Sequence, residues 1–379
     1  MATREGDPAD LATRSVMKIV KAPESMTSKE RVMAAFAHSK VDRVPIDYLC
    51  NSGIDARLKS ALGIGADDHE SLRQALGVDF RGTGPWFAGP KRFADILGRH
   101  IDPVYGIRTC WIEHESGGYW DFCDFPLRDA SQEEVDAWPL ASADDFDYST
   151  LEGQVRRYEG YALYYGDAGL GDIINSTGML RTMEQVLVDL ITDDPAGLRL
   201  IDRKIDLQLE VMRRSLERIG GRIDFVWMGE DLGTQIAPLV SVDLFRRHIR
   251  PRHQKIIDLA HSFGLPVMTH TCGSSSWAYE DFIEMGVSAV DTLQPEAHDM
   301  SPQYLKERFG SRLMLHGCIS TAGPVAYGTV EDVRRDVSEK LEILMPGGGY
   351  CLSPTHQLQD NSPVENVIAM YQTAHDLGR

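Results

Sequence analysis

The sequence predicts an α/β fold, a (β/α)8 TIM barrel with an N-terminal extension and irregular insertions. Beyond about residue 160, short apolar runs alternate with long amphipathic segments, and this rhythm favours parallel strands joined by crossover helices. The length of 379 residues suits one barrel with insertions. Several apolar runs are followed directly by polar or metal-competent side chains, and strand ends of this kind are where barrel enzymes place their chemistry.

The first residues are expected to form a flexible arm. Residues 1–26 are polar and lack the apolar core of a signal peptide, which argues against secretion. No apolar run in the chain approaches the ~20 residues that a membrane span needs. We therefore expect a cytoplasmic protein with a single domain over residues 27–379.

The remaining elements follow in order along the chain. Thr27 or Ser28 can cap a first helix, and residues 51–160 carry aromatic and glycine-rich pieces typical of hairpins and loops. From the apolar periodicity we predict helices at 30–38, 183–191, 196–219, 243–263, 277–285 and 330–344. Short apolar, strand-like runs lie at 44–48, 173–175, 224–228, 265–270, 289–293, 312–317 and 349–354.

The composition excludes one class of partner and limits the role of the cysteines. The formal net charge is −18, whereas binding to nucleic acid needs clustered Lys and Arg side chains. The six cysteines are scattered along the chain without a paired framework. In a cytosolic protein such cysteines are free thiols or metal ligands rather than disulfides.

The tetrapeptide His270-Thr271-Cys272-Gly273 indicates a metal site. It follows an apolar run, and two ligand-capable side chains two residues apart at a turn can reach one ion. Thiolate and imidazole are the common ligands of zinc. Alone, a His-x-Cys pair is more often a buried cysteine beside a hydrogen-bonded histidine. For a third ligand we prefer His356, placed beyond the last strand, to Cys351, which lies within that strand and can be a core residue.

Other strand ends supply further candidates. Glu230 and Asp231 follow the run at 224–228, and neighbouring strand residues point in opposite directions. We expect one of them, in the first place Glu230, to be a fourth metal ligand and the other, Asp231, to act on the substrate or on a metal-bound histidine; the two can exchange these roles, and either can instead cap a helix. Gln294 and His316 also follow apolar runs, which makes them candidate catalytic residues.

Aromatic side chains in the first half of the chain are candidates for a substrate pocket. The irregular part and its borders contain Tyr48, Trp86, Phe87, Trp120, Phe122 and Tyr164, of which Tyr48, Trp120 and Tyr164 are the first choices. An aromatic lining would suit a methoxylated aromatic ring, and core packing under long loops is an equally simple explanation.

Several motifs together resemble one protein family. The chain is similar to the uroporphyrinogen decarboxylase-like superfamily, and most of all to its zinc- and cobalamin-dependent methyltransferases. The similarity covers residues 27–375, and it is carried by Ser28-Lys29-Glu30-Arg31-Val32, Arg43-Val44-Pro45, Gly229-Glu230-Asp231-Leu232-Gly233, His270-Thr271-Cys272-Gly273, Leu293-Gln294-Pro295, His316-Gly317, Gly348-Gly349-Tyr350, Pro354-Thr355-His356 and Pro363-Val364-Glu365-Asn366.

The resemblance implies a (β/α)8 barrel and an activity. It implies Zn2+ held by a His-x-Cys pair and a later cysteine, and here the position matching that cysteine is His356. It also implies an O-demethylase that takes a methyl group from a small-molecule methyl donor and passes it to the Co(I) cobalamin of a separate corrinoid protein. The chain shows no appended cobalamin-binding segment of its own, and a homodimer stays open.

Two other activities remain as alternatives. The first is methyl transfer from a methylcobamide to a thiol, against which the histidine at position 356 counts. The second is a metal-independent lyase similar to the decarboxylase itself. True decarboxylases of the family carry an arginine-rich segment that grips the carboxylates of the substrate, whereas residues 44–58 here contain one arginine. A binding protein without activity fits poorly with so many reactive strand ends.

Overall fold

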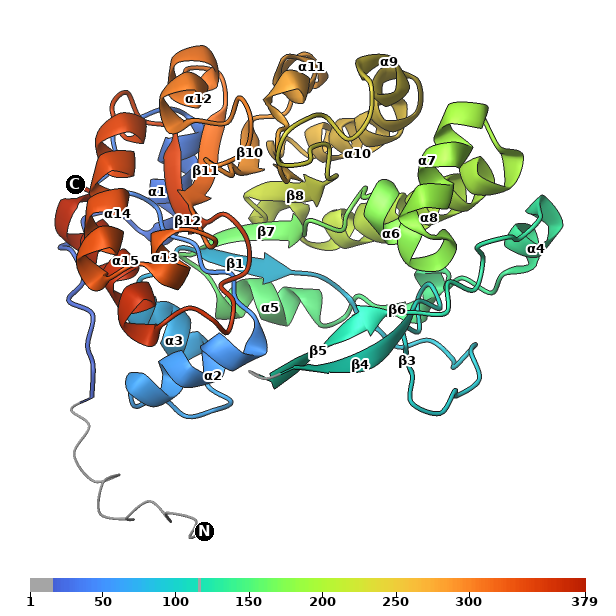
Figure 1. Cartoon of the computed structure of the whole chain (residues 1–379), viewed down its shortest axis with the longest axis horizontal. Coiled ribbons are helices and arrows are strands. Elements are labelled where there is room, and N and C mark those ends of the chain that lie inside the picture. Colours follow the sequence, from blue (N-terminus) through green and yellow to red (C-terminus); the bar gives the residue numbers. More distant parts are fainter. Residues whose placement is uncertain (1–15, 115–116) are drawn as a thin grey trace, which may run out of the picture.

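A curled parallel sheet forms the centre of the protein (Figure 1). The computed structural model describes residues 16–114 and 117–379. Within them the sheet has seven strands in the order β1-β7-β8-β9-β10-β11-β12, and all neighbours run parallel. The strands are β1 (Phe80–Thr83), β7 (Ala162–Gly166), β8 (Phe225–Gly229), β9 (Val267–Thr271), β10 (Ala289–Thr292), β11 (Met314–Ile319) and β12 (Tyr350–Pro354). The predicted α/β class with parallel strands is therefore confirmed.

The run at 44–48, predicted as a strand, lies between the two edges of this sheet. Ile46 makes one parallel bridge to Leu352 of β12. On its other side, the Ile46 carbonyl accepts a hydrogen bond of 2.9 Å from the Asp79 backbone N–H. The Ile46 N–H donates a hydrogen bond of 2.9 Å to the Asp79 carboxylate, and Pro45 has no N–H to donate. Two backbone hydrogen bonds of 2.9 Å, from Asp47 N–H to Leu352 and from Leu352 N–H to Pro45, make up the bridge to β12, so the contact between the sheet edges is short.

Helices surround the sheet (Figure 1), most of them on its outer side, whereas the first packs against the inner cluster of side chains. They are α1 (Ser28–Phe36), α2 (Ser52–Ala61), α3 (His69–Leu76), α4 (Gln132–Ala137), α5 (Leu151–Arg157), α6 (Ile174–Arg181), α7 (Met183–Thr192), α8 (Pro195–Ile219), α9 (Val242–Leu244), α10 (Arg250–Ser262), α11 (Tyr279–Met285), α12 (Pro302–Phe309), α13 (Pro324–Tyr327), α14 (Val330–Leu344) and α15 (Val364–Leu377). Short 3-10 or π turns occur at Ala143–Asp145, Gly220–Arg222, Phe245–Ile249 and Ser276–Ala278. None of the helices in the described part combines the length and apolar character needed to span a bilayer.

Two predictions for the first half of the chain are wrong. The stretch 51–160 contains not only loops but also the barrel strand β1, whose burial is concealed in the sequence by Arg81. This guanidinium is buried because it pairs with Glu70 at 2.8 Å. The run at 173–175 is the start of α6 rather than a strand, and the strand in this part of the chain is β7.

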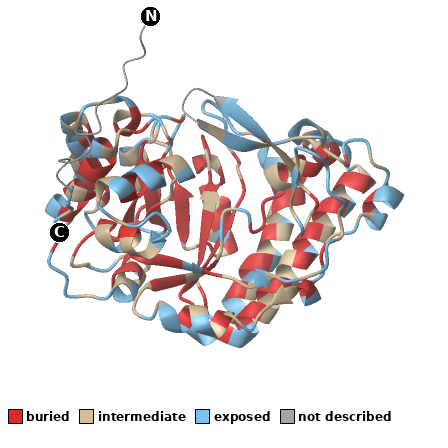
Figure 2. Cartoon of the chain, turned by 90° about the horizontal axis from the view of Figure 1, so that it is seen from below, coloured by how far each residue is buried: buried red, intermediate tan, exposed pale blue. Residues whose placement is uncertain are grey.

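The remaining strands form small antiparallel pieces at one side of the sheet. β2 (Trp86–Phe87) pairs with β6 (Phe146–Asp147), and β3 (His100–Ile101) pairs with the hairpin of β4 (Arg108–His114) and β5 (Gly117–Phe122). The hairpin is largely exposed, as its pale blue colour in Figure 2 shows. Hairpins were expected in this stretch, and the structure confirms them.

The N-terminal arm and the first motifs have defined partners where they are described. Residues 1–15 of the predicted flexible arm lie outside the described residues. Val20 and Ala22 donate backbone hydrogen bonds to Gln372 and His375 of α15. Arg31 and Arg43 both reach the buried carboxylate of Asp79, at 2.6 and 2.7 Å. The arginines of the first two resemblance motifs thus hold together the amino-terminal end of the barrel.

Apolar residues form a core on each side of the sheet. The larger cluster fills the space between strands and outer helices, and it includes Leu163, Val226, Val290 and Leu315. The smaller cluster contains side chains that alternate with these along the strands: Phe80, Phe225, Trp227, Met268, Met314 and Cys351. The smaller cluster fills the inside of the curled sheet, below the carboxyl ends of the strands.

Candidate metal centre and active site

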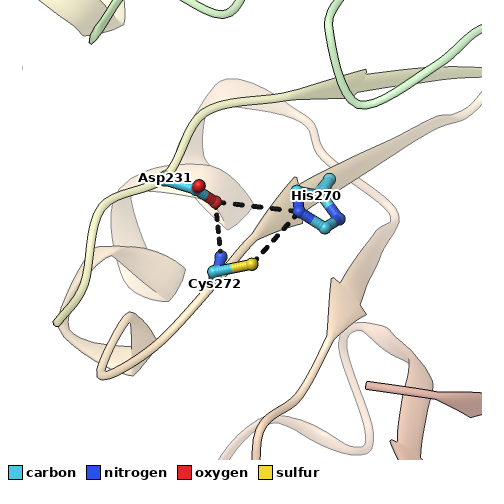
Figure 3. A group of neighbouring side chains, drawn as sticks. All are labelled: Asp231, His270 and Cys272. Carbon is cyan, nitrogen blue, oxygen red and sulfur yellow. Dashed lines mark hydrogen bonds and ion pairs between the residues drawn. The ribbon is translucent and has the colours of Figure 1, made fainter. Parts of the chain in front are cut away.

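Three side chains with metal-binding atoms meet at the carboxyl ends of β8 and β9. These strands are parallel neighbours, and the register pairs Gly229 with His270. The ligand atoms of Asp231, His270 and Cys272 all lie within 4.8 Å of one another (Figure 3). The sulfur of Cys272 is 3.4 Å from Nε2 of His270, which in turn is 3.7 Å from Oδ1 of Asp231. Two members of this group, His270 and Cys272, form the predicted His-x-Cys pair.

The backbone after Cys272 turns sharply to form this site. Gly273 has φ = 69°, and a Cβ atom there would lie 2.3 Å from the Gly233 carbonyl oxygen. The Gly273 N–H donates a hydrogen bond of 2.5 Å to Oε1 of Gln294. Gln294, predicted as catalytic, therefore fixes the loop that carries Cys272. Its carbonyl oxygen is occupied by this backbone contact.

Asp291 forms a hydrogen bond with the side of the His270 imidazole that faces away from Cys272. The sequence interpretation did not include Asp291 among the candidate site residues. Its Oδ2 atom is 2.6 Å from Nδ1 of His270, and its Oδ1 atom is 2.7 Å from Nδ1 of His316. Nε2 of His316 is 3.3 Å from the Asp47 carboxylate. A chain of buried charged groups thus runs from the candidate metal centre into the barrel. An acidic residue in the middle of the apolar run 289–293 was the signal for it, because such a residue is seldom buried without partners.

This arrangement orients the imidazole of His270. Because Nδ1 faces Asp291, Nε2 points toward Cys272 and Asp231. A carboxylate behind a histidine in this way is the usual support of a metal-bound imidazole. His316, predicted as catalytic, lies deeper and acts on the site only through Asp291.

Burial and charge shift the pKa values of these groups in opposite directions. Burial lowers the pKa of His270, but the hydrogen bonds to Asp291 and Cys272 outweigh it and raise the pKa well above its ordinary value. Burial raises the pKa of the Cys272 thiol, although His270 partly offsets this effect. Burial also acts to raise the pKa of Asp291, and the two histidines reverse the shift and lower it. A cation bound here would stabilise the thiolate form that burial disfavours.

The structure brings Asp231, and not Glu230, next to His270 and Cys272. The Glu230 carboxylate is fully buried and accepts hydrogen bonds from the backbone N–H groups of Ile173 and Ile174, at 2.8 and 3.1 Å. The Glu230 carboxylate therefore satisfies backbone N–H groups at the amino end of α6. Asp231 instead faces Cys272 and accepts the backbone N–H of Cys272 at 3.0 Å. Nδ2 of Asn175 donates to the other carboxylate oxygen of Asp231 at 2.7 Å, which fixes its orientation.

The two candidates for a further ligand lie at different depths. Cys351 is buried in the inner cluster of the barrel, and burial raises the pKa of its thiol to about 11. His356 follows β12 in an exposed loop and is not part of the group of three. Atoms around its ring lower the pKa of His356 by desolvation, and the charge of His270 lowers it further. The charge of His270 thus acts on His356, which places His356 near the candidate metal centre. Cys351 instead contacts His316, at the deeper end of the chain of buried charged groups.

The predicted substrate residues lie mostly outside the cavity at this site. Tyr164 packs against Phe225 and Trp227, with ring centroids 5.4 and 5.3 Å apart. Tyr48 donates its hydroxyl to Asp55 at 3.2 Å. Trp120 is 53% exposed on the hairpin and contacts Trp111. The structure brings none of these three residues into the lining of the cavity described next.

A cavity of about 680 Å3 opens beside the metal-binding group. Asp231 and His270 form part of its wall. Phe122, at the end of the hairpin, and Phe125, just after it, form an aromatic part of the wall. Met179 of α6 and Met183 of α7 add further apolar surface. The hairpin thus contributes to the pocket through Phe122 rather than through Trp120.

The comparisons with known proteins agree with this architecture. A methyltransferase from Methanosarcina mazei superposes with a TM-score of 0.58 at 17% identity, over 93% of this chain and 99% of that one. Xylanase 10B from Thermotoga maritima, at a TM-score of 0.39 and 13% identity, covers 62% of this chain and 82% of its own, too weak a similarity to bear on the fold. A search by sequence among curated proteins gave no match. Residues 178–377 match the family described as uroporphyrinogen decarboxylase (URO-D), so more than half of the chain, including the metal-binding group, carries the family's pattern. The chain belongs to the uroporphyrinogen decarboxylase (URO-D) family, as the resemblance of its motifs predicted.

Proposed function

We propose that the protein is a zinc-dependent methyltransferase of the cytoplasm that demethylates a methoxylated aromatic compound. The methyl group passes to the Co(I) cobamide of a separate corrinoid protein. The observation that carries this proposal is the meeting of Asp231, His270 and Cys272 at the wall of a partly aromatic cavity. Membership of the URO-D family and the similarity of fold to a protein named as a methyltransferase support it. We further infer that residues 44–48 act as the eighth strand of a closed barrel.

The donor set fits zinc. A thiol, an imidazole and a carboxylate are all ligands that zinc accepts, and three protein ligands leave a position for substrate. Asp231, His270 and Cys272 would hold the ion, with His356 close enough to join them after a movement of its loop. When bound, zinc acts as a Lewis acid that stabilises negative charge on the ether oxygen of the substrate.

The residues of the chain supply orientation and exclude water. Asp291 directs Nε2 of His270 toward the ion site, and Asn175 directs the Asp231 carboxylate to the same place. Phe122, Phe125 and the methionines of the cavity wall offer apolar contact to an aromatic ring. The methoxy group would then face the open side of the cavity, where the methyl acceptor can approach.

The acceptor has to come from outside the chain. In the transfer, the C–O bond breaks, its electron pair stays on oxygen, and the carbon bonds to the electron pair of the incoming nucleophile. Cys318, two residues after His316, is a poor nucleophile for this step, because it is fully buried in the outer core, where burial raises the pKa of its thiol to about 12. A cobamide carried by a partner protein, as the resemblance implies, is the acceptor we propose.

The test is a methyl transfer assay under reducing, anaerobic conditions. With free cob(I)alamin and a set of methoxybenzenes, we expect methylcobalamin to form, followed by its visible spectrum. Cys272→Ala should abolish the reaction and Cys318→Ala should not. Consumption of methylcobalamin in the presence of a thiol, with no demethylation, would favour the reverse reaction. Release of CO2 from a carboxylated substrate by metal-free protein would instead identify a lyase.

A further inference from the structure

A second cavity lies directly against the first. It has a volume of about 450 Å3, and the two cavities share Gly169, Asp172 and Met179 in their walls. The second cavity extends away from His270, toward the loop after β7 and the long helix α8. The wall between a candidate reaction site and a second empty space is therefore only a few side chains thick.

Met179 is the part of this wall that can move. It is half-buried on α6 and has an unbranched side chain, which adapts easily to a neighbouring ligand. Asp172, in contrast, is held in place because the backbone N–H groups of Asn175 and Ser176 both donate to its carboxylate at 3.1 Å. Of the three residues that line both cavities, Met179 is therefore the one whose side chain can move to connect them.

The second cavity is lined mainly by apolar groups. Leu207 and Val211 of α8 face it, together with Leu170 and Phe146 from the opposite side. Tyr105 offers a hydroxyl group, which accepts a hydrogen bond of 3.2 Å from Gln208 and can still donate its own proton. The walls of both cavities contain acidic residues and no Lys or Arg. A carboxylate or phosphate that reached the second cavity would face Asp167 and Asp172 in its wall, while Lys204, behind that wall, already donates to Ser176 at 2.7 Å.

The size of the cavity defines the ligand. An apolar cavity of about 150 Å3 already accepts benzene. A space three times larger, with apolar walls, takes a second ring or a chain of several carbon atoms. The shared wall places such a group in line with a ring bound beside His270.

We propose that the methyl donor is an elongated molecule whose methoxylated ring fills the first cavity and whose uncharged, apolar remainder passes Met179 into the second. This inference rests on the proposed function for the identity of the ring. It adds the substrate class: extended neutral aryl ethers rather than small or carboxylated ones.

The test compares ligands of different length on the purified full-length protein by titration calorimetry. The ligands are methoxybenzene, 4-butylmethoxybenzene and a methoxybenzene with a carboxypropyl group at the same position. Each buried methylene should raise affinity about fourfold, so burial of only two of the four butyl carbons should make the butyl compound bind at least about tenfold more tightly than methoxybenzene. The carboxypropyl compound should lose this gain.

Substitutions assign the gain to the second cavity. Val211→Phe fills this cavity, and the ratio of the two affinities should fall to near one; Leu207→Phe is a second variant with the same expectation. Val188→Phe, a matched change at a 44% exposed position of α7 outside both linings, should keep the ratio of the wild type. Thermal melting confirms that each variant is folded.

The outcomes separate this inference from the proposed function. An affinity that does not rise with chain length, or a rise that survives in both filled variants, would overturn the second binding site. Demethylation of methoxybenzene in that situation would leave the proposed function intact. A length-dependent gain that disappears in the filled variants supports the site even if no methyl group is transferred, and it is then the proposed function that fails.

Discussion

The carboxylate of Asp291 offers the sharpest test of how the proposed metal centre is built. Asp291→Asn keeps the size of the side chain but leaves one acceptor oxygen for the two histidines that it bridges at 2.6 and 2.7 Å. At most one of the two hydrogen bonds survives, and the amide NH2 then faces an imidazole N–H. Breaking a buried ionic pair costs about 3–5 kcal/mol, and losing the support of a metal-bound histidine lowers metal affinity about 10–100-fold.

Both quantities can be measured on the same variant. Urea unfolding of metal-free protein gives the free energy of unfolding, and competition with a chelating dye gives the zinc affinity. Asp281→Asn is the matched control, because Asp281 is also buried and ion-paired, with Arg246 at 3.0 Å, but lies on α11 outside the barrel. It should lower stability and leave zinc affinity unchanged. If Asp291→Asn keeps zinc affinity within about twofold of the wild type, the bridge is structural only and our account of His270 is wrong.

Further predictions concern single residues. Purified protein should contain about one zinc per chain by elemental analysis. Cys272→Ala should lose this zinc, whereas Cys351→Ala should keep it because Cys351 lies in the inner core. Loss of zinc from Cys351→Ala alone would reverse the assignment. Asp231→Asn should reduce zinc affinity about 10–100-fold, while Glu230→Gln should act on stability through α6; equal zinc affinities of the two variants in dye competition would contradict the division of roles. Burial raises the pKa of Asp172 to about 6, above about 3.9 in the unfolded chain, so the folded state binds more protons between these values. The contribution of Asp172 to the free energy of unfolding should therefore fall as the pH rises from about 4 to about 6. Asp172→Asn should accordingly gain stability relative to the wild type over this range in urea titrations; a difference between the two proteins that does not change with pH would refute the shift.

The sequence predicted those parts of the fold that have regular periodicity. The helix predicted at 330–344 matches α14, and the strands around His270 and Asp291 were found to within a few residues. β1 was missed because Arg81 and Gly82 interrupt a run of four residues, and only the ion pair with Glu70 makes its burial possible. Local sequence contains no information about that pairing.

The candidate site was predictable to the same extent. His270 and Cys272 follow one strand, so their proximity is a local property of the chain. The choice between Glu230 and Asp231 depends on where α6 begins, because the backbone N–H groups of Ile173 and Ile174 attract the Glu230 carboxylate. Neither the second cavity nor the bridge from His270 to His316 can be predicted without knowing which strands are neighbours.

The single bridge between Ile46 and Leu352 has a consequence for how the barrel assembles and opens. The two residues lie near opposite ends of the chain, so this contact closes a very long loop, and loop closure is an entropic cost that later contacts must offset. Around it, side-chain pairs with Asp79 replace a continuous backbone ladder. Contacts of this kind form late and separate early, whereas β8 to β11 are joined by regular pairing between neighbours in sequence. The candidate metal centre lies within this continuous part of the sheet, so local opening of the barrel at its seam would leave the metal ligands in place.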